Sequence, residues 1–190
     1  ALFDKLRQRK LTNARRPVEE GPASHNPDSS LSPAQAACAN LITPATRNRV
    51  LELVLEGPLS TPALHAAARQ LGELHDSLTV RFDHERQHFV RHDTPLTLHE
   101  ATADLAPLTS LREQLATDTS TGLQLACLQN DQHTCHLLLA AHPLLLDADA
   151  LLQLATQLLA LAGGSITPAA IKPATTANMN QFAAWSAQLL

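Results

Sequence analysis

The segment from residue 134 to residue 162 constrains the fold more than any other part of the chain. A leucine-rich run at 134–141 leads into His142, and Asp147 precedes a second apolar stretch at 147–162. The first run has the length and composition of a buried strand, and the second repeats its leucines with helical spacing. This segment therefore predicts a buried strand, a short loop and a helix that packs back on the strand.

From residue 31 onwards, the chain alternates strand patterns with helix patterns. Short apolar or alternating runs predict strands at 49–55, 78–82, 88–91, 96–100, 123–129 and 134–141. Apolar residues at helical spacing predict helices at 33–41, from Ser60 or Thr61 to 74, and at 105–117, 147–162 and 180–190. This order of elements predicts an α/β sandwich in which helices pack on a mixed sheet.

Composition divides the chain into three parts. Residues 1–16 contain six basic side chains and one acidic side chain, so we expect a basic helix or a solvated linker there. A docking helix for an acidic partner is the alternative for this part. Residues 17–30 are rich in proline, serine and acidic residues, which is typical of a flexible linker. The folded domain is expected at 31–190, which is enough chain for one ordinary core.

The charge and the apolar content exclude several classes of partner. A net charge of −4 with 3% aromatic residues argues against nucleic acid, which needs clustered cations and stacking rings. No apolar run reaches the length that spans a membrane, and the charged N-terminus lacks the apolar core of a signal peptide. We therefore expect a soluble, cytoplasmic protein that binds neither nucleic acid nor membrane.

The three cysteines, Cys38, Cys127 and Cys135, are an odd number and lack the spacing of a metal site. Cys127 and Cys135 fall on neighbouring predicted strands. A disulfide between them is not expected in a cytoplasmic protein. We therefore predict that all three are reduced, buried thiols.

The segment around His142 resembles the core motif of the condensation domains of nonribosomal peptide synthetases, His-His-x-x-x-Asp-Gly. In an ungapped match, His142 takes the place of the first histidine and Asp147 the place of the aspartate. Pro143 stands where the family has its catalytic histidine, and Ala148 replaces the glycine. The resemblance therefore implies a condensation-like domain with a degenerate motif.

This resemblance continues in order from about residue 31 to the end of the chain. Segments that resemble further family motifs lie at 31–35, 53–64, 75–82, 118–125 and 181–185. The span corresponds to the N-terminal half of a condensation domain, the half that resembles chloramphenicol acetyltransferase. The implied fold is a mixed sheet flanked by helices, in agreement with the pattern of elements.

The aspartate of the motif has lost its family partner. In the family an arginine pairs with it, but Thr79 stands at that position. Arg81, two residues further on and on the same face of a predicted strand, is a candidate substitute. Asp147 could instead cap the helix that follows it, where its charge meets the helix dipole. We favour the cap and assign Asp147, Arg81 and Thr79 structural roles only.

Two interpretations of His142 follow from the motif. A loop shifted by one residue would make it the catalytic base, whereas the ungapped flanks favour the family's first, non-catalytic histidine, hydrogen-bonded inside the sheet. Pro143 offers neither a titratable nitrogen nor a backbone N–H, so it can do no acid–base work. We therefore expect no catalytic residue at His142, Pro143, Asp147 or Ala148.

The family joins a carrier-bound acyl thioester to the amine of a second carrier-bound substrate. The degenerate motif implies a non-catalytic, truncated domain of a modular nonribosomal peptide or polyketide synthase. It would act as a structural or docking element between synthase domains or with a carrier protein, whose phosphopantetheine is the one cofactor expected near it. One alternative is the N-terminal half of an active condensation domain that forms amide or ester bonds. A further alternative is self-association through the face that the second half covers in the family.

Other chemistry-bearing residues give weaker indications. His84, His88 and His92 have helical spacing but fall in a predicted hairpin, so we expect solvated histidines and not a metal site. No Gly-x-Ser-x-Gly motif is present, and the cysteines lie in apolar contexts that do not favour a thiolate. No directly bound cofactor or metal is therefore expected.

Overall fold

The computed structural model of the chain describes residues 28–29, 31–43, 45–57, 60–91, 94–102, 107–130 and 133–171. Several predictions fall outside these residues and are not tested by the structure. They are the basic part at 1–16, most of the linker at 17–30, and the final helix at 180–190. His92 also lies outside the described residues.

The main sheet has four strands in the order β2-β7-β6-β5. The strands are β2 (Arg49–Glu56), β7 (Thr134–Ala141), β6 (Leu123–Gln129) and β5 (Leu98–Thr102). β2, β7 and β6 pair in antiparallel fashion, and β5 joins β6 in parallel. The sheet is therefore mixed, as predicted, and β2 and β5 are its two edges.

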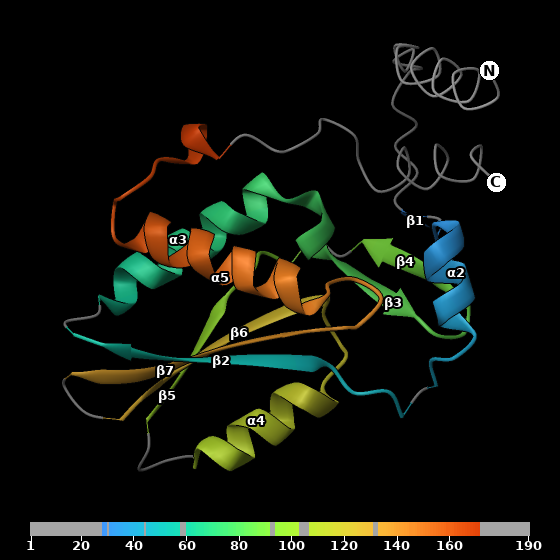
Figure 1. Cartoon of the computed structure of the whole chain (residues 1–190), viewed down its shortest axis with the longest axis horizontal. Helices are drawn as coiled ribbons and strands as arrows, with labels where there is room; N and C mark the ends of the chain where they lie inside the picture. The colour runs from blue at the N-terminus through green and yellow to red at the C-terminus, as the bar shows by residue number, and fades with distance from the viewer. Residues whose placement is uncertain are drawn as a thin grey trace, which may run out of the picture.

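Helices cover both faces of this sheet (Figure 1). α3 (Thr61–Leu74) and α5 (Ala148–Ala162) lie on one face, and α4 (Leu108–Thr117) lies on the other. Each face carries its own apolar core. The core under α3 and α5 is much the larger and includes Leu64, Leu71, Leu125, Leu137, Leu139, Leu151 and Leu158, each with no exposed surface. The predicted α/β sandwich is thus confirmed.

A smaller sheet has the order β1-β4-β3. Its strands are β1 (Asp28–Ser29), β4 (His88–Arg91) and β3 (Val80–Asp83), all paired in antiparallel fashion. Asp28–Ser29 belongs to the segment that we assigned to the flexible linker. Its backbone instead pairs with β4, a contact that composition cannot reveal.

The N-terminal helix α2 (Pro33–Ala39) begins with a capping box. The Ser32 hydroxyl accepts from the Gln35 amide at 3.3 Å, and the Ser32 amide donates to the Gln35 side chain at 2.9 Å. The side-chain amide of Gln35 also donates to the carbonyl of Leu144 at 3.0 Å. This bond attaches α2 to the loop that carries the degenerate motif.

Two strand boundaries differ from the prediction. The strand expected at 78–82 begins at Val80, because Asp76–Thr79 forms a turn of 3-10 helix. The strand expected at 96–100 lies at Leu98–Thr102, although Leu96 is buried. A Cβ on Gly72 of α3 would lie 3.0 Å from the Cβ of Leu96, so the segment before β5 packs closely on the helix.

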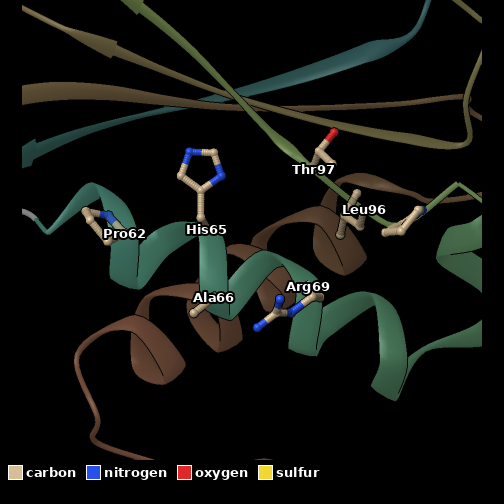
Figure 2. A pocket seen from close by; sticks show the side chains of 7 residues that line it. Pro62, His65, Ala66, Arg69, Leu96 and Thr97 are labelled. Carbon is tan, nitrogen blue, oxygen red and sulfur yellow. The ribbon is translucent and has the colours of Figure 1, made fainter.

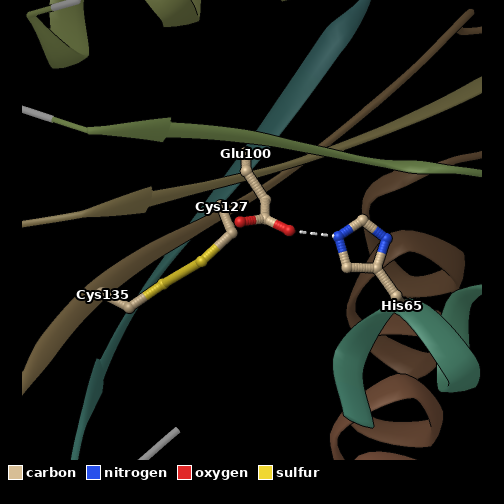
Figure 3. Close-up of a disulfide and its surroundings, with 4 residues drawn as sticks. All are labelled: His65, Glu100, Cys127 and Cys135. Atoms are coloured by element: carbon tan, nitrogen blue, oxygen red, sulfur yellow. Dashed lines mark hydrogen bonds and ion pairs between the residues drawn. A yellow bond between two sulfur atoms is a disulfide. The ribbon is translucent and has the colours of Figure 1, made fainter. Parts of the chain in front are cut away.

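The prediction for the cysteines is correct for the burial of Cys127 and Cys135 and wrong for their reduced state and for the burial of Cys38. Cys127 and Cys135 lie diagonally across the β6–β7 pair, since Cys127 is opposite Leu137 and Gln129 opposite Cys135. They form a disulfide with their Cα atoms 6.6 Å apart (Figure 3). Cys38 is exposed on α2 and free, where we expected a buried thiol. Strand register and helix orientation decide these outcomes, and neither is visible in cysteine spacing.

None of the described helices is both long and apolar enough to cross a membrane.

Candidate functional site

The degenerate motif lies in the loop that connects β7 to α5. The backbone carbonyl of His142 accepts from the amides of Leu145 at 2.9 Å and Leu146 at 3.2 Å, which closes the loop into a tight turn. His142 follows the last residue of β7, Ala141, and Pro143 is the next residue of this turn. Pro143, which the motif match aligns with the family's catalytic histidine, therefore lies within this turn.

The imidazole of His142 points into the protein and is 3% exposed. Its Nδ1 accepts a hydrogen bond from the amide of Leu144 at 3.3 Å. In a neutral imidazole this bond assigns the proton to Nε2. Nε2 is buried and has no hydrogen-bond partner among the described residues. His142 thus offers a buried N–H donor and no free lone pair.

Two rings contact His142, and a third extends the cluster. Phe82 stacks on His142 with the ring centroids 5.2 Å apart, and His84 meets it edge-on at 5.5 Å. Phe89, which is fully buried, packs against Phe82 at 5.6 Å. The prediction that His84 is solvated is wrong, because its Nδ1 is buried in this cluster.

Burial sets the charge state of His142. The loss of hydration on burial, and to a smaller extent the positive charge that His84 can carry, together lower the pKa of His142 to about 4. His142 is therefore neutral at neutral pH. A proton acceptor that is buried, already hydrogen-bonded and neutral down to pH 4 is poorly suited to general-base catalysis near pH 7.

Asp147 occupies the N-cap position of α5. Its Oδ1 accepts from the amide of Ala150 at 2.8 Å, and its backbone is extended. The side chain is exposed, so its charge faces both water and the N-terminal end of the helix. This arrangement is the one that the helix-cap interpretation requires. Ala148 is the first residue of α5 and is also exposed.

The structure does not bring Arg81 to Asp147. Arg81 is exposed on β3, and no hydrogen bond or ion pair joins it to Asp147 in the described part of the chain. Thr79 ends the 3-10 turn before β3 and is half-buried. The suggested ion pair between Arg81 and Asp147 is therefore absent from the described contacts.

Sequence analysis missed a polar network on the α4 face of the sheet. Glu52 of β2 accepts from Nδ1 of His136 at 2.9 Å, and its second oxygen accepts from the guanidinium of Arg112 on α4. The hydrogen bond from Arg112 lowers the pKa of Glu52, burial opposes this effect, and the bond to His136 lowers it further. A glutamate inside an apolar strand pattern was the available sequence signal. The network ties α4 to the sheet.

A groove that was also not predicted runs between α3 and the segment before β5 (Figure 2). Its volume is about 410 Å³, and it is lined by Pro62, His65, Ala66, Arg69, Pro95, Leu96 and Thr97. His65 forms an ion pair with Glu100 at 2.5 Å beside the disulfide (Figure 3). No cluster of three or more metal-ligating side chains occurs within the described ranges.

Comparisons with known proteins identify the fold. No family model matches the sequence, and no curated protein matches it. Among solved structures, the nonribosomal peptide synthetase FmoA3 matches 90% of this chain with 19% of its own, at 20% identity and a TM-score of 0.66. The first condensation domain of the calcium-dependent antibiotic synthetase matches 85% of this chain with 43% of its own, at 17% identity and a TM-score of 0.62.

A third similar structure is the X-domain from teicoplanin biosynthesis, solved in complex with OxyB. It matches 90% of this chain with 40% of its own, at 23% identity and a TM-score of 0.60. The chain therefore spans less than half the length of each of these structures. The condensation-domain fold that the sequence resemblance implied is confirmed, and this chain corresponds in size to about half of such a domain.

Proposed function

We propose that this chain is a non-catalytic, condensation-like element of a modular nonribosomal peptide or polyketide synthase. Its role is to pack or dock against neighbouring synthase domains or a carrier protein. The observation that carries this proposal is the turn after β7, where Pro143 stands between a buried His142 and a helix-capping Asp147.

Amide formation between carrier-bound substrates requires the attacking amine to lose its proton. An imidazole within hydrogen-bonding reach can accept that proton or stabilise the tetrahedral intermediate. Pro143 has no nitrogen that titrates and no N–H to donate. The lone pair on Nδ1 of His142 is used by the amide of Leu144, and the ring is 3% exposed. Neither residue can therefore take the role of the missing histidine.

A docking role has support from one similar structure. The X-domain from teicoplanin biosynthesis forms a complex with OxyB, so a protein with this fold can bind another biosynthetic protein. We propose a comparable use here, with a synthase domain or carrier protein as the partner. The cationic residues 1–16 suit a partner with an acidic surface. The phosphopantetheine of a carrier would approach Ala148, whose methyl group narrows the path that a glycine leaves open.

Product formation tests the absence of catalysis. The protein is incubated with an acyl-loaded donor carrier and an aminoacyl-loaded acceptor carrier, and the released amide is quantified by mass spectrometry. We expect no product above the rate without protein. Product that disappears in His142→Asn would refute the proposal and favour the active half-domain.

Binding of the same carriers tests the docking role separately. Calorimetric titration of unloaded carrier and of isolated neighbouring domains into the protein should detect at least one complex. The variant with the basic residues 5, 7, 9 and 10 changed to glutamine is the matched control. Binding to none of these partners would leave the docking proposal without support and refute it.

A further inference from the structure

β2 is an edge strand whose outer side has no described partner. All eight of its residues pair with β7 on one side, from Arg49 opposite Ala141 to Glu56 opposite Thr134. No other described strand pairs with it. A regular edge of this length presents a row of free backbone N–H and C=O groups, which is a template for pairing with another strand.

The two edges of the sheet differ in how they are protected. β5 has five residues, Pro95 stands just before it, and its His99 and Glu100 are exposed. Short length, proline and charge are the usual means of preventing edge-to-edge pairing. β2 is longer, with eight residues, and has no proline or bulge in its register, although it carries the charged residues Arg49, Glu52 and Glu56. The contrast indicates that the β2 edge is the one available for a partner strand.

The side chains of β2 also form an incompletely covered apolar surface. Leu51, Leu53 and Leu55 pack against the core under α3 and α5 but remain partly exposed. Val54 points to the α4 face and is 56% exposed. A long edge strand with partly exposed leucines and an exposed valine favours association.

We propose that β2 pairs with β2 of a second copy of this chain, in antiparallel fashion about a twofold axis perpendicular to the sheet. Such pairing would join two four-stranded sheets into one of eight strands. This assembly is separate from the role proposed above, because it involves the backbone edge of β2 and not the loop that carries the degenerate motif. The argument for a second copy is that the leucines of β2 complement themselves.

The register follows from the faces of the sheet. Residues directly opposite each other in an antiparallel pair point to the same face, so an odd-numbered residue of β2 must lie opposite another odd-numbered one. With Leu53 on the axis, Leu53 meets its own copy, and Leu51 meets Leu55 of the second copy. Three leucine pairs then form one seam that continues the larger core of both molecules.

The other central register is less favourable. With Glu52 on the axis, two glutamates face each other, and Arg49 lies opposite Leu55. Like charges directly opposite destabilise a sheet. The Leu53 register instead places Glu52 opposite Val54 of the second copy, which joins no like charges. Both registers fit an isologous twofold interface. The register centred on Leu53 is the favourable one, because it pairs leucines and joins no like charges.

Sedimentation velocity on charge variants of Val54 tests the interface. We expect the unmodified chain to be a dimer at micromolar concentration. Val54→Glu places a negative charge opposite Glu52 of the second copy at two positions on the α4 face and should weaken the dimer about tenfold or more. Val54→Lys removes the same apolar surface but introduces the opposite charge, so it should dimerise more tightly than Val54→Glu. Leu152→Glu, at a 51% exposed site on α5, is the matched control and should not change the dimer.

Site-specific crosslinking tests the register. In a Cys38→Ser background, Leu53→Cys should form a disulfide-linked dimer on mild oxidation, because residue 53 faces its own copy. Glu52→Cys should crosslink much less. A monomer at micromolar concentration, a dimer that Val54→Glu leaves unchanged, or crosslinking that favours Glu52→Cys would each overturn the proposal. Circular dichroism of each variant confirms that the comparison is made between folded proteins.

Discussion

Acid should destabilise the folded protein through His142. The folded state holds this imidazole neutral in the cluster with Phe82 and His84, with its pKa lowered from 6.5 to about 4. The unfolded chain exposes the same ring to water and restores its ordinary pKa. Any pH at which only the unfolded state binds the proton therefore favours unfolding.

The sign and the size follow from the two pKa values. Above pH 6.5 neither state is protonated at this site, and the folded state loses nothing. As the pH falls from 6.5 to 4, the unfolded state takes up a proton that the folded state refuses, so the free energy of unfolding decreases. The full difference, reached below pH 4, is about 3 kcal/mol, because one pKa unit corresponds to about 1.4 kcal/mol.

Urea unfolding at a series of pH values between 7.5 and 4 measures this effect. His142→Asn is the reference variant, since its side-chain oxygen can accept from the amide of Leu144 but does not titrate. Histidines that do not interact with His142 contribute equally to both proteins, so the difference between the two proteins reports residue 142 together with its coupling to His84. We expect the unmodified protein to lose about 3 kcal/mol more than the variant over this range.

A constant difference between the two proteins from pH 7 to pH 4 would refute this reasoning. Nuclear magnetic resonance gives an independent check, because the ring protons of His142 report its pKa directly. A measured pKa near 6.5 in the folded protein would show that the ring is hydrated. The stacked arrangement with Phe82 would then not describe the protein in solution.

Four further substitutions test other parts of the structure by urea unfolding. Gly122→Ala should cost more than 3 kcal/mol or prevent folding, because its Cβ would lie 1.7 Å from the carbonyl oxygen of Val80 and no rotamer avoids this backbone contact. Asp147→Ala should lower the free energy of unfolding by about 1 kcal/mol, because the cap of α5 is lost. Arg81→Ala should change it by less than about 0.5 kcal/mol. Equal losses in the two variants would support an ion pair between Arg81 and Asp147. Glu52→Gln should cost about 1–2 kcal/mol, because Arg112 and His136 lose a charged acceptor. An unchanged stability would show that the network is solvated.

The regular elements could be predicted because each depends on local patterns. The leucines at 151, 154 and 158 repeat at helical spacing, and all three are buried under the predicted helix. The pairing of 134–141 with 123–129 follows from two apolar runs joined by a short polar loop. The family motif also located the β7–α5 loop correctly, since strand and helix periods flank it.

The contacts within the candidate site could not be predicted, since they depend on how the two sheets are placed. His84 and His142 are 58 positions apart, and only the docking of the β3–β4 hairpin beside the loop brings their rings to 5.5 Å. The hairpin pattern alone indicated a solvated His84. Similarly, Glu52, Arg112 and His136 come from three elements that no local pattern connects.

The pairing of β2 has a consequence for the synthesis of the protein on the ribosome. β2 ends at Glu56, and its one described strand partner, β7, begins only at Thr134, so β2 is translated well before β7. At typical elongation rates the delay is on the order of ten seconds, during which Leu51, Leu53 and Leu55 have no strand beside them. Nascent chains on adjacent ribosomes of one messenger RNA therefore expose β2 at the same time. Chaperones that bind nascent apolar strands should associate with β2 before the other strands.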